Sequence, residues 1–150
     1  MAETMKLNID LGLRSYEVCD ADGIAIGVIR FNPSDAGLAS RWDNVEKQLR
    51  EIIKGQDDYD TVEKIGELDE KIKGMIDFAF GTKVSEVFFK NVSSLAMCED
   101  GELVIEKMLT AIEPIIVDAQ EAAQKKSEAR IKKHASKYDG TNKGLAPSQK

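Results

Sequence analysis

Few residues in this chain have the type and spacing that catalysis requires. The 150 residues include one histidine, His134, and two cysteines, Cys19 and Cys98. A nucleophilic triad needs a histidine beside a serine or cysteine, but His134 lies in a polar stretch far along the chain from both thiols. Two cysteines cannot build a disulfide framework or a four-thiolate zinc site. We expect a solvated histidine, two free thiols that fill small apolar spaces, and no catalytic residue.

An acidic run at residues 57–60, Asp-Asp-Tyr-Asp, is the one group that invites a metal. A calcium loop beginning at Asp58 needs an oxygen ligand at position 62, glycine at 63 and glutamate at 69. The chain has Val62, Glu63 and Asp69 at these positions. Glycine-rich loops that hold phosphates are also missing. The sequence therefore predicts a solvated acidic link there, with no metal and no cofactor.

Charge is distributed unevenly along the chain. Residues 121–150 hold eight basic and three acidic residues, whereas the first 120 residues hold 13 basic and 24 acidic ones. An acidic body repels phosphates and disfavours nucleic-acid binding. The basic end is typical of a solvated helix terminus, with binding to an acidic partner or a nucleic acid as the alternative.

The N-terminal third has the pattern of a small sheet. Residues 6–13 alternate, with Leu7, Ile9, Leu11 and Leu13 on one face, which predicts a half-buried strand. A change of parity after residue 14 indicates a turn or bulge near residues 12–15. Asp-Ala-Asp-Gly at 20–23 predicts a tight turn, and residues 24–31 form a second apolar run. A sheet of two or three strands needs helices to cover it.

Helical periodicity follows. Asn32 and Pro33 are typical of a helix start, and Gly55 of its end. A second helix is expected from residue 60 or 61 to 80, and a short third one capped by Thr82. The last helix is expected from about Asp100, with a kink or break at Pro114. The predicted apolar faces are Leu38, Trp42, Val45, Leu49, Ile52 and Ile53; Val62, Ile65, Leu68, Ile72, Met75, Ile76 and Ala79; and Leu103, Val104, Met108, Ala111, Ile112, Ile115, Ile116 and Ala119.

These elements predict an α+β fold. A small N-terminal antiparallel sheet of two or three strands packs against a layer of three to four helices, and the C-terminal helix is long. We expect one domain over residues 1–138 and a disordered tail over 139–150, where apolar residues are scarce. No run of residues is long and apolar enough for a membrane span, and the charged first ten residues lack a targeting signal. These features favour a cytoplasmic protein without a membrane partner.

Three stretches together resemble one protein family. The first is the strand pair that ends in Phe-Asn-Pro-Ser-Asp at 31–35 and leads into a helix with Arg41. The second is Ile-Asp-Phe-Ala-Phe-Gly-Thr-Lys-Val-Ser-Glu-Val-Phe at 76–88. The third is a helix with Ile-Glu-Pro-Ile at 112–115 and a charged extension to residue 138. Over residues 5–138 the chain resembles the small tail assembly chaperones of long-tailed phages and prophages of Gram-positive bacteria.

The resemblance implies a binding function. Members of that family shield the tape measure protein while the tail tube polymerises around it, and they have no catalytic residues. It therefore implies a protein of the host cytoplasm that is not expected in the mature virion. Its partner would be the tape measure protein or another phage tail protein.

A surface for such a partner is predicted where apolar residues exceed what a short helix needs. These residues, which could equally fill the core, are Val84, Val87, Phe88, Phe89 and Met97. Two other classes stay open. One is a small regulator that binds a protein, or a nucleic acid through the basic tail; the other is a structural tail protein found in the finished particle. A homo-oligomer is compatible with all of these.

Overall fold

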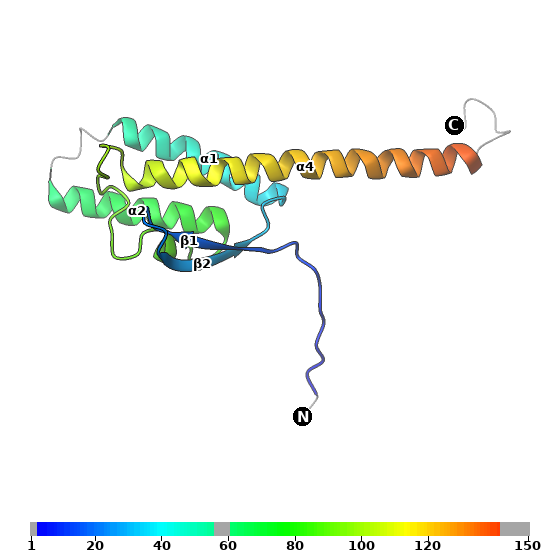
Figure 1. Ribbon diagram of the computed structural model, residues 1–150, viewed down its shortest axis with the longest axis horizontal. Coiled ribbons are helices and arrows are strands. Elements are labelled where there is room, and N and C mark those ends of the chain that lie inside the picture. The colour runs from blue at the N-terminus through cyan, green and yellow to red at the C-terminus, as the bar shows by residue number, and fades with distance from the viewer. Residues whose placement is uncertain (1–2, 56–60, 142–150) are drawn as a thin grey trace.

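The architecture is a small sheet beside a layer of helices. The computed structural model describes the backbone of residues 3–55 and 61–141 and the side chains through residue 135. Strands β1 (Arg14–Cys19) and β2 (Ala25–Phe31) precede helices α1 (Ala36–Lys54), α2 (Val62–Phe80), α3 (Ser85–Phe88) and α4 (Val104–Thr141). Figure 1 shows α1, α2 and the first half of α4 in one layer, with the sheet beside it and the rest of α4 projecting beyond it. This is the predicted α+β fold.

The sheet is an antiparallel hairpin. Arg14 pairs with Phe31 and Val18 with Gly27, with an irregularity after Val18. The predicted turn at 20–23 is confirmed. Asp20 Oδ1 accepts hydrogen bonds from the backbone N–H groups of residues 22 and 24, both at 3.0 Å, and Gly23 has φ +81°, which favours glycine. One sheet face packs on the helices through Ile29 and Phe31.

The strand predicted at 6–13 is wrong, since β1 begins only at Arg14. β2 ends at Phe31, opposite Arg14, and the chain then turns away at Asn32 and Pro33. Residues 3–13 therefore have no neighbouring strand, and they lack regular secondary structure. We call residues 3–13 the N-terminal arm. In Figure 1 it runs away from the helical layer.

The start of α1 also differs from the prediction. Asp35, and not Asn32, is the N-cap, and its Oδ1 accepts from the N–H of Gly37 at 2.9 Å. Asn32 caps the preceding turn instead, because its Oδ1 accepts from the N–H of Ser34. Pro33 lies in that turn and is fully buried. The predicted stop at Gly55 is confirmed.

The core lies where α1, α2, α4 and the sheet meet. Trp42, Phe31 and Phe80 form an aromatic cluster, in which ring centroids lie 5.1 Å apart for Phe31 and Phe80 and 5.7 Å apart for Trp42 and Phe80. On α2 the predicted face is confirmed in the helix interior and wrong at its start, where Val62 and Ile65 are exposed because no element covers the first turn. The buried members of the two predicted faces are Leu38, Trp42, Val45 and Leu49 on α1 and Leu68, Ile72, Ile76 and Ala79 on α2.

The end of α2 and the short helix α3 fix the chain close to the sheet. α2 ends as predicted at Gly81, whose φ of +71° is left-handed. Thr82 does not cap α3; the N-cap is Val84, which makes no side-chain cap hydrogen bond. Glu86 lies in the first turn of α3. Val87 reaches β2, where a Cβ on Gly27 would lie 2.7 Å from Val87 Cγ1.

α4 begins at Val104 rather than near residue 100 and continues through Pro114 without a break. Proline removes one helix hydrogen bond, but Pro114 lies on the exposed side of the helix, so the freed carbonyl can be hydrated. The buried face is wider than predicted: it includes Ile105 and Leu109, while Ala111 is exposed. The reason is that α1 and the segment before α4 cover its first turns from two sides.

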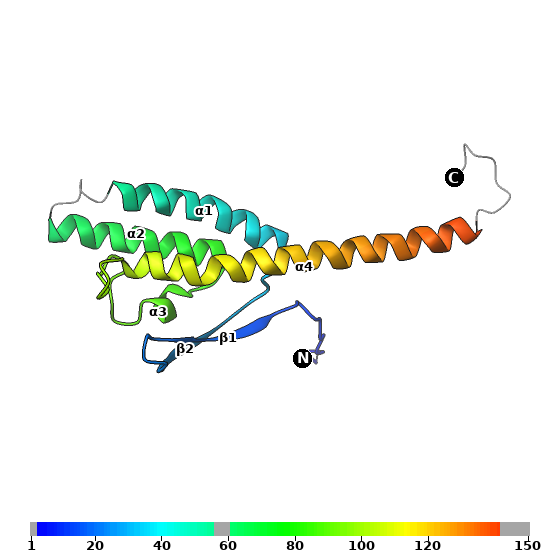
Figure 2. The same cartoon turned by 45° about the horizontal axis from the view of Figure 1, so that its top comes forward.

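The second half of α4 leaves the body. We call residues 121–141 the α4 extension, which Figure 2 shows projecting past the other helices. The last described hydrogen bond between α4 and the rest of the fold runs from Gln120 Nε2 to the carbonyl of Pro33, at 3.1 Å. The predicted tail at 139–150 is wrong for residues 139–141, which are helical. Residues 142–150 and the acidic run at 57–60 lie outside the described residues.

Candidate interaction surfaces

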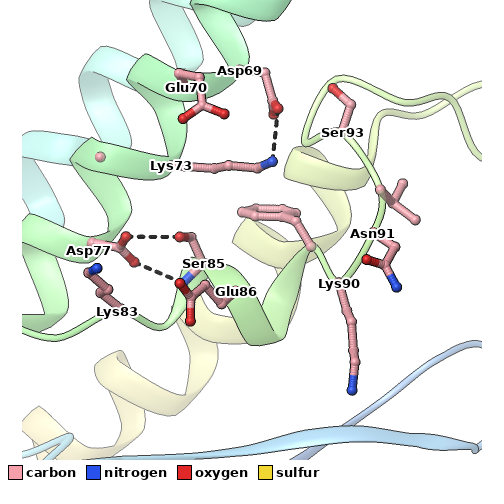
Figure 3. Close-up of a pocket in the computed structure, with 13 residues that line it drawn as sticks. Asp69, Glu70, Lys73, Asp77, Lys83, Ser85, Glu86, Lys90, Asn91 and Ser93 are labelled. Carbon is pink, nitrogen blue, oxygen red and sulfur yellow. Dashed lines mark hydrogen bonds and ion pairs between the residues drawn. The ribbon is translucent and has the colours of Figure 1, made fainter.

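A polar groove of about 760 Å³ lies between α2 and the segment 83–93 that follows it. Among the α2 residues that line it, Asp69, Lys73 and Asp77 follow one another at intervals of one helical turn (Figure 3). The spacing of four residues places all three on one helix face. Serines from the following segment meet the two carboxylates.

Asp69 is the most deeply buried of these charges, with 8% of its surface exposed. Its Oδ1 accepts from the N–H of Ser94 at 2.7 Å and from Ser94 Oγ at 2.5 Å, while Oδ2 pairs with Lys73 Nζ at 2.9 Å. Burial acts to raise the pKa of Asp69, but the bonds from Ser94 and Lys73 outweigh it and hold the pKa below its usual value. Asp69 is therefore a fully hydrogen-bonded carboxylate.

Asp77 repeats this arrangement two turns further along α2. Its Oδ1 accepts from the N–H of Ser85, and its Oδ2 accepts from Ser85 Oγ, both at 2.8 Å. The N–H of Ser85 is one of the free donors at the start of α3, so Asp77 supplies the cap that Thr82 was expected to supply. Neither aspartate is identifiable from spacing alone, because each serine partner is brought in by the tertiary fold.

The groove's two aspartates attach the connecting segment to α2. Asp69 holds residue 94, directly before the segment that leads into α4, and Asp77 holds the start of α3. The Lys73 ammonium group forms an ion pair with Asp69. The arrangement is that of a polar clamp between consecutive helices.

The five residues predicted to bind a partner divide into two groups. Val84 and Phe89 are buried, with 2% and 3% of their surfaces exposed, and they belong to the core. Val87 and Phe88 are half-buried and pack against it; the Phe88 ring lies 6.0 Å from that of Phe80. The fold thus uses four of the five chiefly to join α3 to the sheet and to α2.

Met97, the fifth residue, is exposed and lies on a tight loop. Its backbone forms an isolated antiparallel bridge with Leu103, and the N–H of Cys98 donates to the carbonyl of Glu102 at 2.7 Å. Met97 is not brought together with the other four residues into one surface patch. The predicted set is therefore one packed group and one separate methionine.

A second groove, of about 650 Å³, lies between α1 and α2. Its base includes the buried Val45 and the half-buried Met75. The neighbouring Gly74 leaves open space there, because a Cβ added at this residue would meet no atom within 4 Å. Phe78 stands at the edge with 67% of its surface exposed. Other lining residues are Asn44, Gln48 and Lys71.

Sequence reasoning missed this second groove. The apolar faces of α1 and α2 were predicted as core, and a periodic pattern does not show where two helices leave a gap. One usable signal was Phe78, an aromatic residue that lies off the predicted apolar face of α2.

The N-terminal arm exposes a row of apolar side chains. They are Met5, Leu7, Ile9, Leu11 and Leu13. The arm touches the body at its base, where Asn32 Nδ2 donates to the carbonyl of Leu11 at 2.9 Å. An apolar row of this kind on the surface typically marks an interaction site.

The α4 extension has the opposite character. Its basic side chains are exposed, as is His134, which confirms the expected solvated histidine. The described basic residues there are Lys125, Lys126, Arg130, Lys132 and Lys133.

The remaining candidates for chemistry lie apart from one another. Cys19 and Cys98 are free thiols, as expected, but Cys19 is exposed and not buried, because it lies at the end of β1 beside the turn. The described residues contain no group of three or more His, Cys, Asp or Glu side chains placed to hold a metal ion. No helix in the described part of the chain combines the length and apolar character needed to cross a membrane.

Comparison with known proteins gives no relative for this chain. Neither the models of known protein families, nor the curated proteins, nor the solved structures give a match.

Proposed function

We propose that this protein is a phage tail assembly chaperone that binds a helical segment of the tape measure protein and keeps it soluble. The proposal starts from the resemblance over residues 5–138, which the α+β fold fits. A tape measure protein is long and helical, so its chaperone must offer apolar grooves on an otherwise charged surface.

The observation that carries the proposal is the groove between α1 and α2. Two helical ridges with an apolar base suit a third helix, which would insert side chains spaced three or four residues apart. Phe78 is exposed at the edge, and among the described residues Lys71 is the one charged side chain that lines the groove. An amphipathic helix can therefore bury its apolar face there without desolvating many charges.

The contact is expected to be mainly apolar. Ion pairs at an exposed surface contribute about 0–1 kcal/mol and are screened by salt. Binding should therefore persist at moderate salt concentrations. It should depend on Phe78 and Met75 more than on the charged residues around them.

Co-expression with the candidate tape measure protein tests the proposal. We expect this chain to raise the soluble fraction of the tape measure protein and to co-purify with it. Phe78→Asp should abolish both effects, because it places a carboxylate in the apolar contact. Val62→Asp is the matched control: it lies on the same helix, is exposed, and is not part of the groove.

The result that contradicts the proposal is a folded protein that gives neither solubility nor co-purification. If Phe78→Asp and the wild type raise the soluble fraction of the tape measure protein equally, the chaperone function stands but the groove is not its binding site. Phe78 suits this test better than Val84, since Val84 is buried and a charge there would unfold the protein.

One further observation favours a different function. The α4 extension projects from the body with exposed basic residues, as a regulator that binds an acidic partner or a nucleic acid would require. Deleting residues 121–150 would then abolish binding, and binding would weaken steeply with salt. The chaperone proposal predicts that the same deletion leaves tape measure binding intact.

A further inference from the structure

The N-terminal arm has a strand-like sequence and no strand beside it, and near its base it turns at Gly12, whose φ is +68°. Its apolar residues alternate with polar ones, and the exposed fractions of Leu7 and Ile9 are 83% and 66%. A segment with this period buries its apolar face only as part of a sheet. The arm thus has the sequence of a strand, but it lacks a partner strand that would cover its apolar face.

The protein's own sheet does not supply the other half. The arm leads directly into β1 through Leu13, and β2 has already ended where the arm begins. In the described residues, no backbone hydrogen bond joins residues 3–10 to the body. The hydrogen bond between Asn32 and Leu11 attaches the arm at its base. The backbone groups of residues 3–10 are therefore open to another strand, whereas the Leu11 carbonyl and the Gly12 N–H already have partners.

We infer that the arms of two copies of this chain pair with each other as antiparallel strands, about a two-fold axis at Ile9. The residue numbers of each facing pair then add up to twice the number of the axis residue. On the apolar side Ile9 faces Ile9, Leu7 faces Leu11, and Met5 faces Leu13. Every apolar residue of the row thus meets an apolar residue, which makes the arm complementary to itself, as a two-fold interface requires.

The polar side of the arm disfavours an axis one residue later. With the axis at Ile9, Asn8 faces Asp10 and Lys6 faces Gly12, so no like charges are opposed. With the axis one residue later, Asp10 would face Asp10 and Lys6 would face Arg14. Like charges directly opposite each other destabilise a strand pair. Parallel pairing in register would also oppose identical charges and is disfavoured for the same reason.

This inference is independent of the proposed chaperone function. The groove between α1 and α2 lies on helices, and the arm projects away from the helical layer in Figure 1. Pairing through the arms leaves that groove free in each copy. Failure of one proposal therefore says nothing about the other.

The test is the oligomeric state of the full chain in analytical ultracentrifugation over a range of concentrations. The wild type should form dimers. Ile9→Asp and Ile9→Lys should each be monomeric at concentrations where the wild type is dimeric, because each opposes two like charges at the axis. An equimolar mixture of the two variants should restore a dimer that contains one copy of each. Ile131→Asp, an exposed site on the α4 extension, is the control and should remain dimeric.

The register is tested on the opposite face. Asn8→Lys should tighten the dimer and Asn8→Asp should weaken it, each by roughly 2- to 30-fold, since two symmetric pairs with Asp10 change together. An axis at Asp10 would place residue 8 opposite Gly12 and make both changes neutral. Because the arm barely contacts the body, all these variants should keep the wild-type circular dichroism spectrum.

Three results would each overturn the inference. They are a wild type that stays monomeric at every concentration tested, single variants at Ile9 that stay dimeric, and a mixture that stays monomeric. A monomeric wild type whose arm becomes protected only on addition of the tape measure protein would assign the arm to that partner instead.

Discussion

The two ends of the chain leave the helical body with opposite side-chain chemistry. The N-terminal arm presents a row of apolar residues to solvent, whereas the α4 extension presents lysines and arginines. Both lack tertiary contacts along most of their described length. The extension satisfies its backbone hydrogen bonds within its own helix, but an extended arm can satisfy them only with water or with another strand.

This difference shows that an absence of contacts has two physical meanings. A charged helix end is compatible with water and needs no partner to hold its conformation. An alternating apolar segment gains free energy when it is covered, by roughly 25 cal/mol per Å² of apolar surface. We therefore assign the arm to an interface and treat the extension as an independent helix.

The largest difference in unfolding free energy is expected between a substitution in the helical body and one in the α4 extension. Trp42 is almost fully buried and packs edge-on against Phe80. Trp42→Ala should lower the free energy of unfolding by about 3–5 kcal/mol, as measured by urea denaturation. Ile131→Ala, on the extension, should change it by less than about 0.5 kcal/mol. A similar loss for both would mean that the extension is packed against something.

A milder change separates the volume of Trp42 from its polarity. Its Nε1–H is buried and has no hydrogen-bond acceptor in the described part of the chain. Trp42→Phe should therefore cost less than Trp42→Ala, because it removes an unpaired donor and keeps most of the apolar contact. A larger loss for Phe would indicate an acceptor, such as a water molecule, beside Nε1.

The next effect concerns the polar clamp that holds the body together. Asp69→Ala leaves the N–H and hydroxyl of Ser94 and the charge of Lys73 without their partner. We expect a loss of about 1–3 kcal/mol of unfolding free energy. Asp118→Ala, at an exposed position on α4, is the matched control.

The same carboxylate gives a pH dependence of defined sign. The pKa of Asp69 is lower in the folded protein than its ordinary value of 3.8, so the folded state favours the charged form. Its contribution is complete above the unfolded pKa and is lost as the pH falls through the lower, folded pKa. Thermal unfolding between about pH 6 and pH 2 should show a shallower loss of stability for Asp69→Asn than for the wild type. If the stability of both proteins falls equally with pH, Asp69 does not contribute to the acid sensitivity of the fold.

The smallest effect is expected from shortening the extension. A chain that ends after Gln124 keeps the bond from Gln120 to Pro33, which is the last described hydrogen bond of α4 with the body. Its unfolding free energy should differ from that of the full chain by less than about 0.5 kcal/mol. A fall of several degrees in melting temperature would show that the extension docks and that the contrast with the arm is wrong.

Local chemistry was sufficient to predict most elements. Gly81 ends a helix and Gly23 completes a turn because their backbones need positive φ, and the helices follow from apolar residues at helical spacing. These signals depend on neighbours within a few residues. The long helices and the turn between the two strands could therefore be predicted from the sequence, whereas the bounds of the first strand could not.

Interaction sites depended on segments far apart in the chain. The apolar residues of β2 lie in a paired strand and those of the arm do not, because β2 ends at Phe31, opposite Arg14. The predicted partner residues Val84 and Phe89 are buried because the sheet and α2 cover α3. Phe78 is exposed because no described element covers that side of α2.

The sequence by itself thus determined where the chain is helical, where it turns and where its charges lie, since these depend on local propensity and composition. Only the tertiary structure decided which apolar residues are buried, and which aspartates hold which serines. Burial is a property of packing between distant segments, and a periodic pattern specifies a face without specifying what covers it.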